Sequence, residues 1–432
     1  MSIDSSSAAS SRADGAPTRK RWNLVAILLL TLLVAYLDRV NVSVLVADPI
    51  FLSDMGIKGN PVAMGLLMTS FLLAYGVSNI FLSPLGDYLG PRKAMSLSIG
   101  LWGIALFGGG IAGTFALLIG ARVLLGIGEA MHWPMQSKYV KNWFPPAERG
   151  KANSLWLIGL YAGPAIAMPF FTWVIQSFGW RLSFFVLVFL GLVPMVLLWF
   201  GTRDYPRQMK SVNRAELDLI ETGMKAEAQA EATSDKVSVW DNIKIFITDY
   251  RFWLVTFYYA GTASVWWGTM AWLPSYLRVS RGFSWTEMGA LSSLPYILGV
   301  ISVIIFGWLS DRARRRAPFC AASMLGAAVF LYYGVHAPNN VLAAISISLG
   351  IGSTGIGQPA NWALLQEIVP GKAVGTGAGV MNGVANGAAA LAPVIIGYLI
   401  TLTGNYIAGL MYLVCFASAA FLAMMILVCK KY

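Results

Sequence analysis

Apolar and polar positions form long blocks along this chain, unlike the short periods of a soluble helix or strand. Mainly apolar stretches of about 20 residues, the length that a membrane-spanning helix needs, recur from residue 23 to residue 428. They predict twelve transmembrane helices, at residues 23–47, 62–85, 94–113, 115–140, 152–176, 181–200, 252–278, 287–309, 317–335, 341–366, 374–401 and 406–428.

The composition agrees with a chain that lives mostly in a lipid bilayer. Hydrophobic residues make up 57% of the 432 positions and charged residues only 12%, against about 25% charged in an ordinary soluble domain. The first apolar segment carries Asp38 and Arg39 and is not followed by a small-residue cleavage site. We therefore interpret it as a retained helix and not as a signal peptide.

The basic residues indicate the orientation. Of the 31 Lys and Arg residues, 25 lie in the N-terminal tail, the even-numbered loops and the C-terminus, whereas the opposite side has only Lys58, Arg181, Arg278 and Arg281. The positive-inside rule then predicts a multi-pass protein of the plasma (bacterial inner) membrane with both termini in the cytoplasm. The net charge of +11 follows from these short loops, so we expect no nucleic-acid partner.

Several chemistries are excluded by what the sequence lacks. It contains no Gly-rich phosphate loop, no zinc-spaced Cys/His cluster and, with only His132 and His336, no plausible Ser/His/Asp arrangement. The three cysteines lie in or beside apolar helices and imply no disulfide framework. We expect neither an enzyme nor a bound cofactor or metal.

The chain divides into two halves around its longest hydrophilic stretch. The predicted divisions are a cytoplasmic tail at 1–21, a six-helix bundle at 22–202, a partly helical linker at 203–251, a second six-helix bundle at 252–428 and a tail at 429–432. Matching residues support an internal repeat. Asp87 is matched by Asp311, 224 residues later in the sequence. With a separation of 225 residues, Pro134, Pro145 and Gly150 are matched by Pro359, Pro370 and Gly375. The predicted fold is an all-α membrane protein of two pseudo-symmetric bundles, with a cavity between helices 1, 4, 7 and 10.

Four fully charged side chains fall at membrane depth, where a charge costs a few kcal/mol or more and usually marks function. They are Asp38 and Arg39 in helix one and Arg122 and Glu129 in helix four. Arg122 and Glu129 are seven residues apart and therefore share one helix face, with helix one the expected neighbour. The alternative is a static salt-bridge cluster, although buried ion pairs are poor stabilisers compared with apolar packing.

Sequence motifs give a family resemblance. "SPLGDYLGPRK" (83–93) resembles the loop signature between helices two and three of the major facilitator superfamily, although Ser83 replaces its first glycine and Pro91 interrupts its basic pair. "YLDRVN" (36–41), "RVLLGIGEA" (122–130), "NWFPPAERGKA" (142–152) and "WLPSYL" (272–277) are similar to the organic anion symporters of that superfamily, which include sugar-acid transporters and sialin.

That resemblance implies proton-coupled symport of a small organic anion by alternating access. It implies that Arg39 binds the substrate carboxylate, that Asp38 and Glu129 exchange protons, and that Arg122 links them. Burial raises the pKa of a carboxylic acid and a nearby arginine lowers it, so movement of an arginine can couple substrate to proton. His132, three residues after Glu129, either shares its proton or bonds between helices.

Uncharged polar residues suggest the rest of the binding site. In helices ten and eleven they are Gln358, Asn361, Trp362, Asn382 and Asn386. Amides beside an aromatic plane suit neutral hydroxyl groups, and related symporters place Trp362- and Asn382-like residues against the substrate; the alternative is that the amides only bond neighbouring helices.

Tyrosines add two further candidates. Tyr36 and Tyr75 are expected to line the cavity or to pack, and Tyr75 falls where sugar-acid members carry a binding tyrosine. The Trp266–Trp267 pair is assigned mainly to packing.

A second group of charges is predicted to control conformation. Asp87, Arg92, Lys93, Asp311 and Arg312 lie at the cytoplasmic ends of helices, where they can pair across the halves in an outward-open state and separate when that side opens. The alternative for Arg92 and Lys93 is that they only follow the excess of basic residues in cytoplasmic loops and have no part in gating.

Two other functions stay open, and the anion itself is not determined. "GLYAGPAIAMP" (159–169) partly resembles the motif of proton-driven drug antiporters, with Ala167 and Met168 in place of its paired glycines. A receptor or sensor lacks support because no signalling domain is appended. Sugar acids, smaller hydroxy acids and aromatic carboxylates all present a carboxylate to Arg39. We expect a monomer whose partners are this anion, protons and the lipid bilayer.

Overall fold

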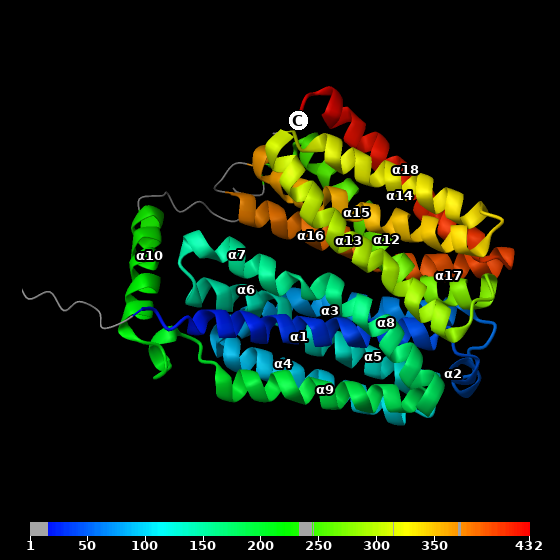
Figure 1. Cartoon of the computed structure of the whole chain (residues 1–432), viewed down its shortest axis with the longest axis horizontal. Coiled ribbons are helices and arrows are strands. Elements are labelled where there is room, and N and C mark those ends of the chain that lie inside the picture. Colours follow the sequence, from blue (N-terminus) through cyan, green and yellow to red (C-terminus); the bar gives the residue numbers. More distant parts are fainter. Residues whose placement is uncertain (1–15, 233–243, 245, 314, 370–372) are drawn as a thin grey trace, which may run out of the picture.

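The computed structural model describes residues 16–232, 244, 246–313, 315–369 and 373–432, and within these ranges it contains helices and no β-strand. The helices form two bundles that lie one above the other in Figure 1. Eleven helices among the described residues are long and apolar enough to cross a membrane. The predicted fold class is confirmed.

The first bundle contains the six spans predicted before the linker. They are α1 (Lys20–Leu45), α3 (Pro61–Leu89), α4 (Pro91–Ile111), the pair α5 (Phe115–Glu129) and α6 (His132–Trp143), the pair α7 (Pro146–Leu157) and α8 (Gly159–Phe178), and α9 (Trp180–Gly201). The short α2 (Pro49–Asp54) follows α1 and marks one end of the molecule, which we call the α2 side (Figure 1). The opposite end, where α1 begins, is the linker side.

The second bundle contains α12 (Tyr250–Ser275), its π-helical extension η2 (Tyr276–Ser280), α13 (Trp285–Ala313), α14 (Ala317–His336), α15 (Asn340–Ile368), the pair α16 (Val374–Ala389) and α17 (Ala392–Thr403), and α18 (Tyr406–Cys429). The seventh predicted span forms α12, which is not among the eleven apolar helices. Its many Tyr, Trp, Thr and Ser side chains lower its hydropathy, and most of them are buried between neighbouring helices.

A proline and an asparagine explain the break between α5 and α6. Pro134 has no N–H to donate to the carbonyl of Ala130 four residues earlier, and the side chain of Asn79 in α3 donates to that carbonyl instead, at 2.7 Å. The repeat-related Pro359 lies inside the continuous helix α15. The helix carrying Glu129 is thus interrupted in the first half of the chain, whereas its counterpart in the second half is continuous.

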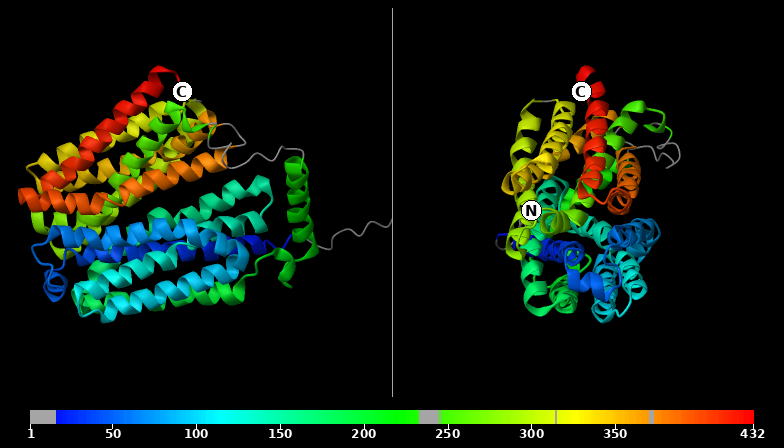
Figure 2. Two further views of the ribbon diagram at one scale, coloured as in Figure 1. Left: turned by 180° about the vertical axis from the view of Figure 1, so that it is seen from behind. Right: turned by 90° about the vertical axis from the view of Figure 1, so that its right-hand side faces the viewer.

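Contacts between the bundles lie towards the α2 side. Gly65 near the start of α3 packs against the backbone of Pro393 in α17, and the hydroxyl of Ser275 donates to the carbonyl of Val46 at 2.9 Å. Figure 2 shows the ribbons of the two bundles diverging towards the linker side. The bundles therefore pack together at the end that carries α2.

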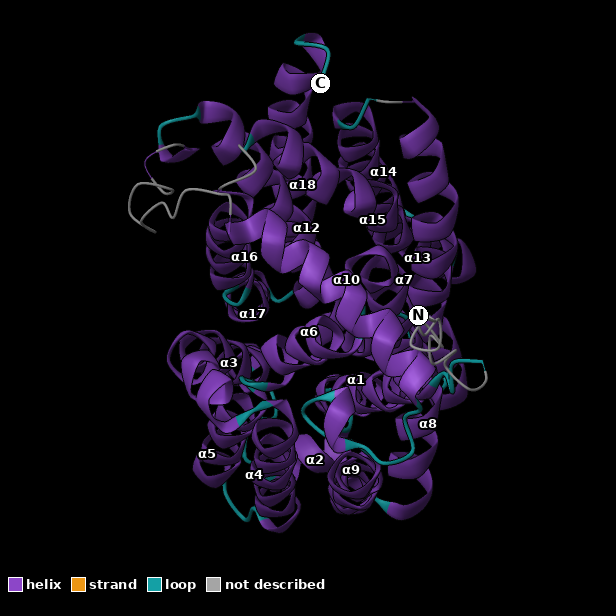
Figure 3. Cartoon of the chain, turned by 90° about the vertical axis from the view of Figure 1, so that its left-hand side faces the viewer, coloured by secondary structure: helices purple, strands orange, loops and turns teal. Residues whose placement is uncertain are grey.

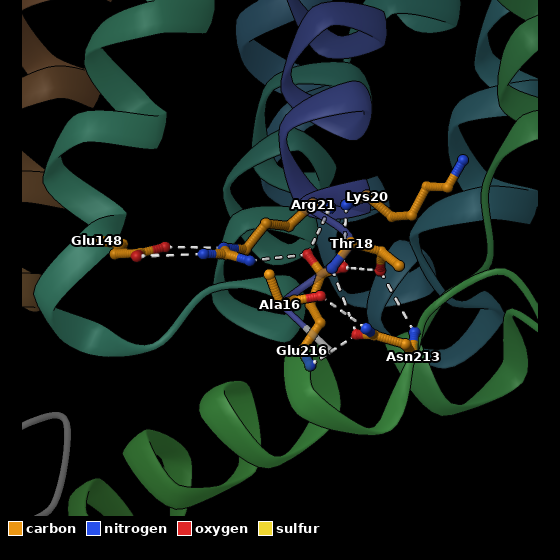
Figure 4. Close-up of polar contacts among 7 residues, drawn as sticks. All are labelled: Ala16, Thr18, Lys20, Arg21, Glu148, Asn213 and Glu216. Atoms are coloured by element: carbon orange, nitrogen blue, oxygen red, sulfur yellow. Dashed lines mark hydrogen bonds and ion pairs between the residues drawn. The ribbon is translucent and has the colours of Figure 1, made fainter. Parts of the chain in front are cut away.

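The linker helix α10 (Arg214–Ala232) follows the one-turn helix η1 (Pro206–Gln208) and crosses the linker side of the molecule (Figure 3). Its Glu216 is fully buried and accepts hydrogen bonds from the backbone N–H groups of Lys20 and Arg21, at 3.0 and 3.1 Å, and from the Thr18 hydroxyl (Figure 4). Arg21 joins Glu216 to Glu148 of α7, at 2.8 Å from each. The linker helix is thereby anchored to the first bundle.

Candidate functional site

The four charges predicted at membrane depth come together inside the first bundle. Asp38 and Arg39 of α1 and Arg122 and Glu129 of α5 are each 6% exposed or less. Arg122 and Glu129 lie on the buried face of α5, as their seven-residue spacing requires. None of the four side chains is therefore exposed on the outer surface of the bundle.

One direct ion pair connects the two helices. The Arg39 guanidinium donates from Nη2 and Nε to a single Glu129 oxygen, Oε2, at 2.5 and 3.2 Å. The other Glu129 oxygen and both oxygens of Asp38 have no hydrogen-bond partner among the described residues. The Asp38 carboxyl group interacts electrostatically with Glu129 and with both arginines. The site therefore holds two acids, and only one of their four oxygens accepts a hydrogen bond from the described part of the chain.

Arg122 has a different role from Arg39. Its Nε donates to the Leu67 carbonyl at 3.0 Å, and its guanidinium lies 4.6 Å from the centre of the Phe71 ring. Both terminal nitrogens lack an acceptor in the described structure. Arg122 thus interacts electrostatically with Asp38 and Glu129, with no direct ion pair to either acid among the described contacts.

The glycines of α5 let the neighbouring helices approach closely. A methyl group on Gly126 would meet the Phe71 carbonyl and the Tyr75 backbone of α3, and one on Gly128 would meet the Trp102 backbone of α4. Glycine is needed at both places because backbone atoms cannot move aside. Helix α1 reaches Glu129 through the long Arg39 side chain.

Aromatic rings surround the Arg39 guanidinium. The centres of the Tyr36, Tyr75 and Trp267 rings lie 4.6, 5.4 and 5.6 Å from its central carbon, distances typical of cation–π contacts. Trp267 belongs to α12 of the second bundle and stacks parallel to Tyr36 at 6.5 Å. Arg39 therefore lies where the two bundles meet, and Trp267, assigned to packing from the sequence, is part of the site.

A hydrogen-bonded row of side chains continues from Trp267 into the second bundle. The Trp267 indole donates to Asn386 at 3.4 Å, Asn386 donates to Asn382 at 2.9 Å, and the Tyr259 hydroxyl donates to the same Asn382 oxygen at 3.2 Å. Tyr259 also contacts the Trp362 ring edge-on at 5.5 Å. Sequence reasoning missed Tyr259; its position two turns before Trp267 on α12 was the available signal.

The amide side chains of Gln358 and Asn361 in α15 each leave an oxygen without a hydrogen-bond donor among the described residues. Gln358 is half-buried and its Oε1 has no donor among the described residues. Asn361 is fully buried; its amide nitrogen lies 4.0 Å from the sulfur of Met381, and its oxygen is also without a donor in that part of the chain. These oxygens are free to accept hydrogen bonds.

His132 lies on the other side of the α5–α6 break from Glu129. Its Nε2 is 3.1 Å from the amide nitrogen of Gln136, and its ring meets the Trp102 ring edge-on at 5.8 Å. Gln136 in turn donates to the Leu28 carbonyl and to Thr31 of α1. The hydrogen-bond contact of His132 thus lies within α6, and Gln136 bonds α6 to α1.

The predicted gating charges lie within their own halves. Arg92 donates to the Trp199 carbonyl from Nε at 2.9 Å, and Asp311 pairs with Arg316 at 2.7 Å. The Arg312 guanidinium lies 5.6 Å from the Trp308 ring centre, and Lys93 is exposed. Asp87 lies in α3, but its side chain is outside the described residues.

Comparison with known families now decides the identity of the fold. The Major Facilitator Superfamily model matches residues 28–393. The chain belongs to the Major Facilitator Superfamily. It is a multi-pass membrane transporter and not an enzyme.

Relatives of this transporter carry small organic anions. The chain is 31% identical to the "Probable sulfoacetate transporter SauU" of Cupriavidus necator, over 90% of this chain and 89% of that protein. It is 29% identical to the "Probable galactarate/D-glucarate transporter GudP" of Bacillus subtilis, over 96% and 93% of the two chains. These similarities agree with the predicted organic anion symporter group.

The three-dimensional similarity supports the fold. A bacterial homolog of the human lysosomal transporter Spinster superposes with a TM-score of 0.78, covering 97% of this chain and 99% of that chain at 19% identity. Among the described residues, no three His, Cys, Asp or Glu side chains gather as metal ligands would. The contacts that the site does contain are ion pairs, hydrogen bonds and ring contacts.

Proposed function

We propose that this transporter carries a small organic anion together with protons, by alternating access, across the plasma membrane. Its linker side and both termini face the cytoplasm, as the Lys and Arg distribution predicts. The observation that carries the proposal is the buried Arg39–Glu129 ion pair at the meeting point of the two bundles. It places a carboxylate-binding group and an ionisable acid in direct contact.

The ion pair suggests how proton and substrate binding are coupled. Glu129 occupies the Nε/Nη2 edge of Arg39, the edge with which a guanidinium binds a carboxylate through two parallel hydrogen bonds. A proton on Glu129 neutralises it and frees that edge for the carboxylate of the substrate. Loss of the proton restores the original pair and favours release of the substrate.

Asp38 supplies a second place for a proton. A charged carboxylate without hydrogen-bond donors is far more costly to bury than a neutral acid, and both Asp38 oxygens lack donors among the described residues. Asp38 and Glu129 interact with each other, so a proton can be held by either acid. We assign both to proton coupling, with Arg122 maintaining the positive field around them.

The second bundle supplies the groups for the rest of the substrate. Asn382, Asn386, Tyr259 and Trp362 form a connected row that begins beside Arg39 at Trp267. Amides and hydroxyls can exchange hydrogen bonds with a polyhydroxy chain, and the indole planes suit its C–H faces. We therefore propose a hydroxylated carboxylate, such as a sugar acid, with its carboxylate at Arg39 and its hydroxyls towards Asn382.

The structure corresponds to an inward-facing state in this proposal. The bundles contact each other on the α2 side, which would face the exterior. Arg92 donates to the Trp199 carbonyl and Asp311 pairs with Arg316, so each bonds within its own half, as expected for gating charges on an opened cytoplasmic side. An outward-facing state would bring these charges together across the halves.

Uptake into proteoliposomes tests the function. Purified protein is reconstituted, an inward proton gradient is imposed, and accumulation of labelled D-glucarate, D-galactonate and sulfoacetate is measured. We expect gradient-dependent accumulation of at least one acid and its loss with an uncoupler. Export of a lipophilic cation with no uptake of any acid would instead indicate the drug antiporter alternative.

A further inference from the structure

We propose that a pocket between α1 and α7, on the linker side, binds an anionic phospholipid. The pocket has a volume of about 800 Å³, within the range of roughly 300–1,000 Å³ found for small-ligand sites. It lies outside the Arg39 site and takes no part in the proposed transport cycle. Its lining includes the cationic residues Arg19, Arg21 and Lys151 and the apolar residues Ala26, Leu29 and Ile158.

The lining changes from cationic to apolar along both helices. Arg19 immediately precedes α1, and Lys151 lies about one and a half turns into α7, closer to the linker side than Ile158 at the end of that helix. Ala26, Leu29 and Ile158 lie further along the same helices, and Leu29 is about 14 Å from the start of α1 at 1.5 Å per residue. A phospholipid is complementary to this lining, because its anionic phosphate would lie at the cationic end of the pocket and its acyl chain at the apolar end.

The pocket faces away from the space between the bundles. Ile158, Ile166 and Trp173 are 46%, 51% and 56% exposed and recur at intervals of eight and seven residues, so they form one apolar stripe on α7–α8. Other faces of α8 are occupied, since Gly163 packs against Tyr36 of α1 and Tyr161 against Gly299 of α13. An apolar stripe left exposed on a membrane-spanning helix contacts lipid, so the pocket opens to the bilayer.

The charges of the pocket favour a phosphate. Among the residues that the structure describes, Glu148 is the only acidic one in the lining, and both of its oxygens accept from Arg21, at 2.8 and 3.3 Å (Figure 4). Neither Arg19 nor Lys151 is paired with a carboxylate among the described residues, and the Lys151 ammonium lies 5.3 Å from the Trp22 ring centre. Basic pockets between transmembrane helices bind anionic headgroups, and an indole at this depth is typical of the interface.

Native mass spectrometry of the full chain in detergent tests the site with three probes: dioctanoyl phosphatidylglycerol, dioctanoyl phosphatidylcholine and glycerol 3-phosphate. We expect phosphatidylglycerol to bind at least tenfold more tightly than either of the others. The double variant R19Q/K151Q should bind phosphatidylglycerol about thirtyfold more weakly, since each cation near a membrane surface contributes about fivefold. K210Q/K431Q removes two exposed charges elsewhere and should bind normally.

Substitutions that fill the apolar part of the pocket test the proposal independently of its charges. Ala26→Phe and Ile158→Trp alter exposed positions, and each should weaken phosphatidylglycerol binding while the protein remains monodisperse on size exclusion. Unchanged binding in R19Q/K151Q and in both of these variants would place the lipid elsewhere and overturn the proposal. Equal affinity for glycerol 3-phosphate would show a soluble-phosphate site and would also overturn it.

Discussion

Arg39 and Glu129, ninety residues apart in the chain, form a buried ion pair with an Nη2–Oε2 distance of 2.5 Å. A buried pair of this kind is no stronger a stabiliser than well-packed apolar side chains, so stability alone does not explain it. The aromatic rings around Arg39 include one from each bundle, Tyr36 and Trp267. A change in the charge of Glu129 is therefore felt at the interface that rearranges during transport.

Arg39 should be required for binding because its planar guanidinium group can donate two parallel hydrogen bonds, in addition to supplying a positive charge. Arg39→Ala should abolish binding of the organic acid, and Arg39→Lys should weaken it by more than tenfold, since two parallel charge-assisted hydrogen bonds are reduced to a point charge. Isothermal titration with an acid identified by uptake measures this effect. Arg181→Lys, at an arginine that bonds the Ala112 carbonyl, is the matched control. Wild-type affinity in Arg39→Lys would argue against a bidentate contact.

Asn382 should distinguish long hydroxylated acids from short ones. Asn382→Ala removes the acceptor shared by Tyr259 and Asn386, and a lost neutral hydrogen bond is worth about 1 kcal/mol. Binding of D-glucarate should weaken about fivefold, whereas sulfoacetate, which has no hydroxyl group, should change by less than twofold. Competition against a labelled acid gives both values. Equal losses for both acids would assign Asn382 to helix packing.

Asp87 should affect transport more than binding. Asp87→Asn should leave substrate affinity measurable and slow uptake, because a gating charge changes the exchange between conformations and does not touch the ligand. Affinity in detergent and uptake rate in proteoliposomes are compared for the same preparation. A loss of affinity as large as that in Arg39→Ala would contradict this division of roles.

Glu216 should make anchoring of the linker helix sensitive to acid. Burial alone would raise the pKa of Glu216, but hydrogen bonds from Thr18, Arg21 and Lys20 outweigh it and hold the pKa below its ordinary value of 4.5. The stabilisation is therefore fully present above pH 4.5 and is lost as the pH falls through the lower folded-state pKa. Thermal unfolding of wild type and Glu216→Gln should differ most near pH 7 and converge on acidification. A difference in unfolding temperature between wild type and Glu216→Gln that increases below pH 4.5 would contradict this prediction.

The sequence predicts those parts of the structure that depend on the local pattern of apolar residues and on the free-energy cost of burying a charge. Apolar length predicts the spans, and the expense of burying Asp38, Arg39, Arg122 and Glu129 identifies them as a group. The ion pair between Arg21 and Glu216 could not be predicted in the same way, because it depends on how two segments 195 residues apart in the chain meet. Trp267 was missed for a similar reason: an aromatic residue in an apolar helix has the same pattern whether it packs or faces a cavity.

Prolines illustrate a further limit of sequence pattern. Pro134 and Pro359 occupy equivalent positions of the repeat, yet a break precedes Pro134 and the helix around Pro359 is continuous. In the first half, the Asn79 side chain satisfies the carbonyl left free by the break. Only the packed structure reveals which neighbour is available to do this.

Proton coupling through Glu129 is the central claim, and Glu129→Gln tests it most directly. Glutamine mimics the protonated acid, so the variant should bind substrate and exchange it between two substrate pools at rates near those of wild type. It should fail to concentrate substrate when an inward proton gradient is imposed, whereas wild type accumulates it. The two assays are run on the same proteoliposomes. Gradient-driven accumulation by Glu129→Gln at the wild-type level would show that Glu129 is not an obligatory proton carrier and that its pair with Arg39 is structural.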